Sequence, residues 1–211
     1  PYAPVAGLLD LRSLAANWMK RRYKAEYAVN ETVVTCGGKF GLYSALQILT
    51  EPGDEVLIAA PYWVSYPEMI KLASAVPRPI KTSEEQQWKL TPDSLRSHIT
   101  KKAKVLLFNN ACNPTGALYS REEIAELLDI AAEMNLMVIS DEVYSELVFD
   151  GHPFVSCSSF SEHRSRVIVI ESCSKNFAMA GWRVGFAFGP SEVISNMIAL
   201  QSQSTTGTAL I

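Results

Sequence analysis

The sequence lacks the long apolar runs and leader segments of membrane and secreted proteins. No apolar stretch approaches the roughly 20 residues that a helix needs to cross a bilayer, and no signal peptide opens the chain. A formal net charge of −3 gives no electrostatic reason to expect nucleic acid or an anionic membrane as a partner. We therefore expect neither a membrane protein nor a nucleic-acid-binding protein.

Cysteine and histidine are also scarce. Cysteine occurs only as Cys36, Cys112, Cys157 and Cys173. No two cysteines form a C-x-x-C motif, and the three histidines make no ligand cluster with them. Disulfides and a metal site are therefore not expected. Free thiols in a cytoplasm-like compartment are expected instead.

Hydrophobic residues make up 48% of the 211 positions, which is enough for a substantial core. A single domain of this length buries roughly 70% of the surface of its unfolded chain. The sequence begins at Pro1 without a methionine and stops at Ile211 without an obvious closing element. We expect it to be a segment of a longer protein.

Short apolar runs alternate with helical periodicity along the chain. The predicted strands span residues 32–36, 56–59, 105–108, 137–139, 167–170 and 184–188. The predicted helices span residues 8–23, 37–49, 67–73, 120–134 and 191–203, and a further helix starts at Pro92. Pro77 and Pro79 confine their extended segment to a sheet edge or to a connection outside the sheet. Strands that are apolar throughout and alternate with helices predict an α/β fold, with a mostly parallel sheet covered by helices on both faces.

Lys175 is the most informative residue. It follows the apolar strand 167–170, with hydroxyls at Ser172 and Ser174 and an arginine at Arg183. We expect apolar neighbours to desolvate its amine, which would favour the neutral, nucleophilic form. Arginine and serine suit a phosphate. An amine for an aldehyde beside donors for a phosphate indicates a pyridoxal 5′-phosphate pocket.

Two other interpretations of this segment are open. Most lysines are solvated surface charges. The spacing from Ser172 to Lys175 also fits the S-x-x-K motif of serine acyl-enzymes, which requires S-D-N and K-T-G companions. The nearest matches, at 140–142 and 81–83, are wrong at their last positions and lie upstream, so the acyl-enzyme interpretation is weak.

Polar groups follow the other predicted strands. These are Gly37-Gly38-Lys39, Trp63, Asn113-Pro114-Thr115-Gly116 and Asp141-Glu142 with Tyr144. The glycines could present a helix N-terminus to a phosphate, although Phe40 excludes a P-loop. Each signal alone fits a plain turn or a core side chain. Because ligands bind beyond the carboxyl ends of the strands, the set together indicates one cofactor site.

The order of these motifs resembles class I aminotransferases, above all the bacterial-type aspartate and aspartate/prephenate aminotransferases. The resemblance covers practically the whole chain and rests on N-P-T-G at 113–116, D-E-x-Y at 141–144, S-x-S-K at 172–175 and G-W-R at 181–183. It implies a fold type I, pyridoxal 5′-phosphate-dependent homodimer. Residues 1–211 would then be the cofactor-binding large domain.

The resemblance also implies a role for each motif residue. Lys175 would hold the cofactor as an aldimine and shuttle a proton, and Asp141 would pair with the pyridine nitrogen. Tyr144 and Asn113 would bind the ring oxygen, and Trp63 would stack on the ring. The phosphate would be bound by Gly37, Gly38, Lys39, Ser172 and Arg183, and Tyr2 would reach the neighbouring subunit's site. Trp63 and Asn113 would also contact substrate. The expected reaction is ping-pong transfer of an amino group from an amino acid, aspartate or another acidic one, to a 2-oxo acid.

The sequence departs from the family pattern in places. Gly41 stands where alanine is usual, and residues 204–208 lack an expected proline. The family's arginine for the substrate α-carboxylate would lie beyond Ile211. A cofactor-binding fragment without turnover, and another fold type I reaction such as a β-lyase or a decarboxylase, are therefore alternatives.

Overall fold

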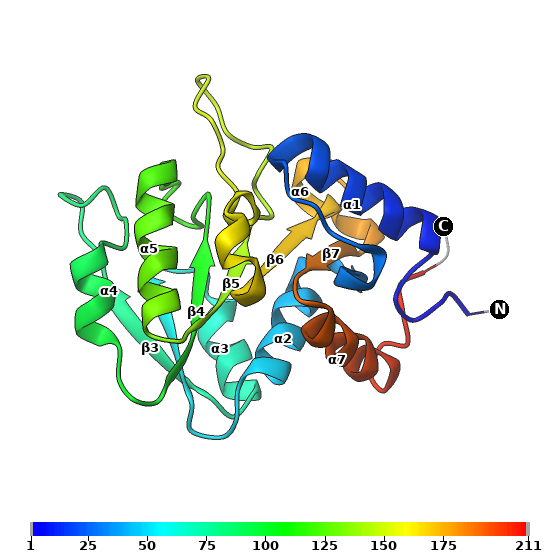
Figure 1. The fold of residues 1–211 in the computed structure, drawn as a ribbon, viewed down its shortest axis with the longest axis horizontal. Coiled ribbons are helices and arrows are strands. Elements are labelled where there is room, and N and C mark those ends of the chain that lie inside the picture. Colours follow the sequence, from blue (N-terminus) through cyan, green and yellow to red (C-terminus); the bar gives the residue numbers. More distant parts are fainter. Residues whose placement is uncertain (1, 210–211) are drawn as a thin grey trace.

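The computed structural model describes residues 2–209, and within them a seven-stranded mixed sheet organises the chain (Figure 1). The strands are β1 Thr32–Cys36, β2 Glu55–Ala60, β3 Val76–Lys81, β4 Ala103–Asn109, β5 Met137–Asp141, β6 Val167–Ser172 and β7 Val184–Phe188. Their order across the sheet is β1-β7-β6-β5-β4-β2-β3. Strand β7 is antiparallel to both of its neighbours, and the other pairs are parallel. The predicted mostly parallel sheet is confirmed.

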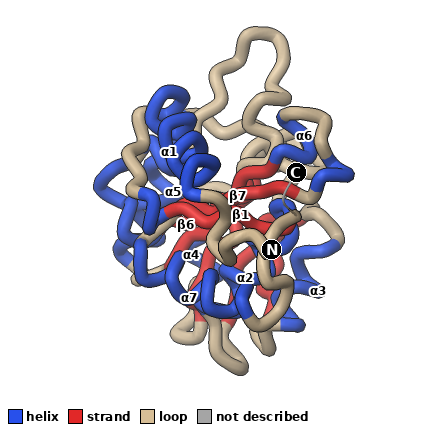
Figure 2. The backbone as a smooth tube through the Cα atoms, turned by 90° about the vertical axis from the view of Figure 1, so that its right-hand side faces the viewer, coloured by secondary structure: helices blue, strands red, loops and turns tan. Residues whose placement is uncertain are grey.

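Helices cover both faces of the sheet. They are α1 Leu9–Tyr23, α2 Gly37–Leu49, α3 Ser65–Leu72, α4 Pro92–His98, α5 Arg121–Glu133, α6 Cys173–Asn176 and α7 Ser191–Ser202, with short 3-10 turns η1 Val29–Glu31, η2 Cys157–Ser159, η3 Ser161–Arg166 and η4 Ala180–Trp182. One core contains side chains of α1, α4 and α5, and the other contains side chains of α2, α3 and α7. Figure 2 shows the strands between α1 and α5 on one side and α3 on the other. No helix within residues 2–209 is long and apolar enough to cross a membrane.

The central strands are buried on both faces, which explains why they are apolar throughout. In β2, Leu57 belongs to one core, and Val56 and Ile58 on either side of it belong to the other. All three side chains are at most 1% exposed. This alternation follows from the two-residue repeat of a strand, and it ties both helix layers to one sheet.

Two features of the fold involve proline. The segment with Pro77 and Pro79 is strand β3 at the sheet edge, one of the two predicted locations, where it pairs with β2 alone. Helix α3 starts at Ser65, two residues before the predicted start at Pro67. Proline is tolerated in a first helical turn because the N–H groups there have no intrahelical acceptor.

The direction of the strands brings the predicted site residues to one edge of the sheet. Strands β1, β2, β4, β5 and β6 run the same way, so their carboxyl ends meet there. Strand β7 runs the opposite way, so the residue before it, Arg183, lies at that edge as well.

Candidate active site

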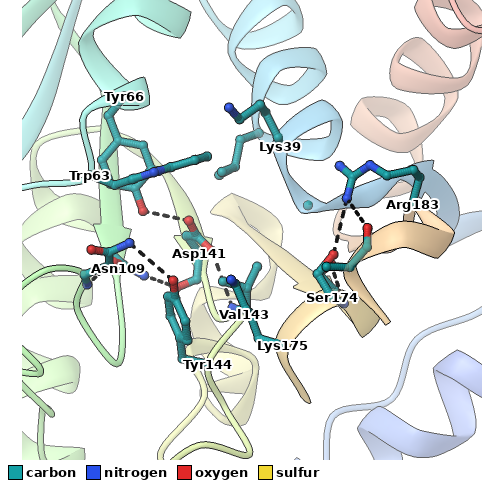
Figure 3. A pocket seen from close by; sticks show the side chains of 15 residues that line it. Lys39, Trp63, Tyr66, Asn109, Asp141, Val143, Tyr144, Ser174, Lys175 and Arg183 are labelled. Carbon is teal, nitrogen blue, oxygen red and sulfur yellow. Dashed lines mark hydrogen bonds between the residues drawn. The ribbon is translucent and has the colours of Figure 1, made fainter. Parts of the chain in front are cut away.

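A cavity of about 220 Å³ lies at this edge of the sheet. Most of the predicted site residues line it, namely Gly38, Lys39, Trp63, Asn113, Asp141, Tyr144, Ser172, Lys175 and Arg183. Figure 3 shows their arrangement, with Asp141 and Tyr144 on one side and Arg183 and Ser174 on the other. Gly37 adjoins the cavity through Gly38. Tyr2 does not line it and is 90% exposed.

The end of the cavity around Asp141 is buried. Asp141 is the last residue of β5 and is 3% exposed. The Tyr66 hydroxyl donates a hydrogen bond of 2.6 Å to Oδ2, and the Val143 N–H donates a longer one of 3.4 Å to Oδ1. Burial raises the pKa of Asp141 to about 6, although both hydrogen bonds act in the opposite direction. A cation placed against this carboxylate would relieve the cost of its burial.

Hydrogen bonds join the N-P-T-G turn to the D-E-x-Y turn. The Asn113 side-chain amide donates to the Tyr144 hydroxyl over 3.2 Å. Asn109, the last residue of β4, accepts from the Asn113 N–H over 2.8 Å and donates to the Asp141 carbonyl over 2.9 Å. These bonds fix two polar side chains, Asn113 and Tyr144, on the same wall of the cavity as Asp141.

Sequence reasoning missed Tyr66 and Asn109. Tyr66 was given no role from the sequence, and its partner Asp141 is 75 residues away. A usable signal was its position three residues after Trp63, which brings the two rings together edge to face at 5.6 Å. For Asn109 the signal was a polar residue at the end of an apolar strand.

Trp63 and Lys39 form another part of the cavity wall. The Lys39 ammonium lies 4.7 Å from the centre of the Trp63 ring, a cation–π contact. The sequence predicted that Lys39 would bind phosphate, whereas here its charge contacts an aromatic face. A phosphate-binding role for Lys39 stays a prediction, as does ring stacking by Trp63.

The opposite end of the cavity is built for an anion. Helix α2 begins at Gly37 directly after β1, and no side chain caps its first turn. Gly37 has φ of +75°, and a Cβ there would overlap the Arg183 guanidinium. Arg183 Nη1 donates to the Ala180 carbonyl over 2.9 Å and lies 3.5 Å from Ser174 Oγ. A guanidinium, a hydroxyl and the positive end of a helix therefore meet in one place.

Ser174, not Ser172, is the hydroxyl beside the guanidinium. Ser172 Oγ accepts from the Ser174 N–H over 3.1 Å and donates to the Val184 carbonyl over 3.2 Å. It is the N-cap of α6, the single helical turn that directly follows β6. Ser172 still lines the cavity, and its predicted role at the phosphate stays a prediction.

Lys175 lies on α6 between the two ends of the cavity. Figure 3 shows its side chain between Tyr144 and Ser174, on the side of Asp141. The expectation that apolar neighbours would desolvate the amine is wrong for the described chain, because Lys175 is exposed. The adjacent Phe177 is 57% exposed and does not line this cavity. The reason is that α6 and η4 are short elements at the rim of the sheet.

These features fit pyridoxal 5′-phosphate. Its phosphate matches the anion site at Arg183, its basic ring nitrogen matches the buried carboxylate of Asp141, and its aldehyde matches the amine between them. The narrow gap at Gly37, which a Cβ would fill, lets the helix N-terminus approach the same spot as the guanidinium. Fold and cavity thus define an α/β domain with a site for a phosphorylated aldehyde.

Comparison with known proteins identifies the family. The model "Aminotransferase class I and II" matches residues 1–211. An aspartate aminotransferase of Bacillus sp. strain YM-2 is 41% identical over 206 residues, which are 97% of this chain and 53% of that protein. A probable aspartate/prephenate aminotransferase of Thermus aquaticus is 40% identical over 205 residues, which are 97% of this chain and 53% of that protein.

A solved structure of a Thermus thermophilus aspartate aminotransferase double mutant superposes with a TM-score of 0.95 at 38% identity. The match covers 99% of this chain and 54% of that one. The chain belongs to the class I and II aminotransferase family, whose members use pyridoxal 5′-phosphate. It spans about half the length of the curated relatives that it matches.

Proposed function

We propose that this chain is the pyridoxal 5′-phosphate-binding large domain of an aminotransferase that transfers the amino group of an acidic amino acid, such as aspartate, to a 2-oxo acid. The observation that carries the proposal is a single cavity that presents Lys175 between a buried carboxylate, Asp141, and an anion site at Arg183. The printed names of the relatives support the reaction and the acidic substrate.

When bound, pyridoxal 5′-phosphate supplies an aldehyde for an amine and a ring that withdraws electrons from the adjacent carbon. In this chain Arg183 and the first turn of α2 hold the phosphate, with Ser174 as a further donor. Ionised Asp141 would keep a proton on the ring nitrogen, and Tyr144 and Asn113, which are hydrogen-bonded to each other, would contact the ring oxygen. The side chain of Trp63 orients the ring by stacking.

Lys175 has two tasks in the proposed reaction. Its Nζ would be the amine that holds the aldehyde of the bound cofactor, in exchange with the amino group of the substrate. The same amine would also act as a general base and acid that moves a proton between substrate and cofactor. Both tasks need the amine within reach of the ring, and the position of α6 beside Asp141 and Tyr144 supports this.

The proposal extends to partners and location. The family resemblance implies a homodimer in which Tyr2 reaches the phosphate of the neighbouring subunit, and the 90% exposure of Tyr2 leaves it accessible for such a contact. The arginine for the substrate α-carboxylate would come from chain outside residues 1–211. All four cysteines are free thiols, which supports a reducing, cytoplasmic location.

The test is amino transfer by the protein that contains this chain. Loaded with pyridoxal 5′-phosphate, it should convert aspartate and 2-oxoglutarate to oxaloacetate and glutamate, with parallel lines in double-reciprocal plots, as ping-pong kinetics requires. Formation of ammonia, pyruvate and a thiol from an S-substituted cysteine, with no 2-oxo acid added, would indicate a β-lyase instead. Cofactor binding without either reaction would leave only a binding role.

A further inference from the structure

Asn176 joins the lysine-bearing helix to the turn that carries Asp141 and Tyr144. Its Nδ2 donates to Ser145 Oγ over 2.9 Å and to Glu171 Oε2 over 3.1 Å. Its Oδ1 accepts from the Glu146 N–H over 3.2 Å. One side chain thus contacts strand β6 below it and the turn after β5 beside it.

Helix α6 depends on such lateral bonds. It is a single turn of four residues, and so short a helix does not hold itself together in water. On one side Ser174 lies 3.5 Å from the Arg183 guanidinium, a long contact. On the other side Asn176 makes three shorter bonds. Since Asn176 follows Lys175 directly, those three bonds fix where the lysine backbone lies.

The groups that hold Asn176 are buried. Glu171 is 3% exposed and Ser145 is 1% exposed. Glu171 Oε1 has no hydrogen-bond partner among the described residues, and Oε2 accepts the bond from Asn176. Burial, together with the neighbouring Glu142, raises the pKa of Glu171 well above its usual value. Loss of the Asn176 amide would leave this buried carboxyl short of a hydrogen-bond donor, which is costly.

Asn176 cannot act on a bound cofactor directly. It does not line the cavity that contains Lys175, and it faces a separate hollow between α1 and α6 together with Glu171 and Phe177. Any effect on chemistry must therefore pass through the position of Lys175.

We propose that Asn176 is a positioning residue: its carboxamide, anchored on Glu171 and Ser145, sets the distance between Lys175 and the turn that carries Asp141 and Tyr144. The inference rests on the proposed function, because it concerns how the lysine meets the cofactor.

The test exchanges donor and acceptor between Asn176 and Glu171 in the full protein loaded with pyridoxal 5′-phosphate. Asn176→Asp keeps an acceptor for the Glu146 N–H and replaces the amide donor with a second carboxyl against Glu171. Glu171→Gln alone keeps a bond, because the new amide oxygen accepts from Asn176. The double variant Asn176→Asp, Glu171→Gln restores the bond with its polarity reversed.

Three quantities are measured: kcat, KM for the amino acid, and the midpoint of the pH titration of the visible absorbance of the lysine-bound cofactor. Asn176→Asp should lower kcat roughly ten- to a hundredfold, the range for small misplacements of reacting groups, and leave KM nearly unchanged. It should also shift the absorbance midpoint. Glu171→Gln should resemble the wild type, and the double variant should recover most of the kcat and the midpoint.

Gln47→Glu is the matched control. Gln47 is a partly buried amide whose Nε2 donates to the Leu72 carbonyl over 2.9 Å, away from the cavity. This change should lower the melting temperature without moving kcat or the absorbance midpoint. Should Asn176→Asp not fold, Ser145→Ala, which removes a single partner of Asn176, should shift the midpoint in the same direction by a smaller amount.

Wild-type kcat and midpoint in Asn176→Asp or Ser145→Ala would overturn the proposal, and so would a double variant no better than Asn176→Asp. An equal midpoint shift in Gln47→Glu would reduce the effect to general stability and overturn it too. Failure of the proposed function looks different: the wild-type protein would then show no visible absorbance that depends on Lys175.

Discussion

The two ends of the cavity are constructed differently. Around Asp141, side chains are buried or half-buried. Hydrogen bonds of 2.6 to 3.2 Å join Asp141 to Tyr66 and, through Asn109 and Asn113, to Tyr144. Around Lys175 and Arg183, side chains are exposed, and the contacts to Ser174 Oγ and the Cys36 carbonyl are 3.5 Å long.

The difference follows from the elements that supply each end. The Asp141 end comes from the ends of the buried parallel strands β4 and β5 and from α3, which packs in a core. The Lys175 end comes from α6 and η4, which are single turns outside the sheet. Elements with few buried contacts open at low free energy. We infer that the Asp141 end is preorganised and that ligand binding orders the Lys175 end more strongly.

The largest effect is expected at the exposed end. Lys175→Ala should abolish covalent capture of pyridoxal 5′-phosphate and all transamination, because the other lysine of the cavity, Lys39, lies over the Trp63 ring. Noncovalent binding of the cofactor should persist, since Arg183 and Asp141 are untouched. Absorbance spectra and equilibrium dialysis measure the two separately. Native-rate transamination by this variant would refute the assignment.

At the buried end, Asp141→Ala should raise the activation free energy of transamination by about 3 kcal/mol. This is the size expected when a preorganised charge is removed from an active site. Asp141→Asn is the matched variant, because it keeps an acceptor for the Tyr66 hydroxyl and removes only the charge. Both should reduce kcat by a hundredfold or more in steady-state assays. Wild-type rates in Asp141→Asn would mean that the ring nitrogen does not need an anion.

Arg183→Ala should weaken cofactor binding and leave its chemistry largely intact. A hydrogen bond to a charged group contributes roughly 1.5–3 kcal/mol, so the dissociation constant should rise about ten- to a hundredfold. Fluorescence titration with the cofactor measures this change. If kcat at saturating cofactor fell as far as in Asp141→Asn, the division of the cavity into a binding end and a chemical end would be wrong.

The smallest effect is expected from Tyr66→Phe. This change removes the 2.6 Å bond that lowers the pKa of Asp141, so the pKa should rise further above about 6. Because only the ionised carboxylate pairs with a protonated ring nitrogen, the pH at which cofactor affinity is half-maximal should move upward. At pH 8 the loss of cofactor-binding free energy should be about 1 kcal/mol or less. An unchanged pH profile would show that Tyr66 does not tune Asp141.

The buried carboxyls also give stability a pH dependence with a definite sign. Burial raises the pKa of Asp141 from 3.8 to about 6 and that of Glu142 from 4.5 to about 7. The folded state therefore binds these protons more tightly than the unfolded state, and their ionisation costs stability as the pH rises from about 4 to 7. Urea unfolding of the cofactor-free protein should show a smaller loss over this range in Asp141→Asn. An equal loss of stability in the wild type and in Asp141→Asn would mean that other groups cause the pH dependence.

Sequence reasoning located the sheet, the cofactor class and most of the cavity, for a physical reason. Apolar runs mark the strands, and polar residues such as Asp141 that directly follow or end them must lie at the carboxyl edge of a parallel sheet. What it missed depends on packing between distant segments. The bond from Tyr66 to Asp141 and the contact between Lys39 and Trp63 are not encoded in local periodicity. The exposure of Lys175 reflects the shortness of α6, which composition alone could not show.

The most direct test of the account is to find which lysine binds the cofactor. The protein is incubated with pyridoxal 5′-phosphate, reduced with borohydride to make any lysine–cofactor bond permanent, digested and mapped by mass spectrometry. Two lysines line the cavity, Lys175 and Lys39. The account predicts one label per chain, on Lys175, at pH 8. A label on Lys39, or the same weak label spread over surface lysines, would contradict it.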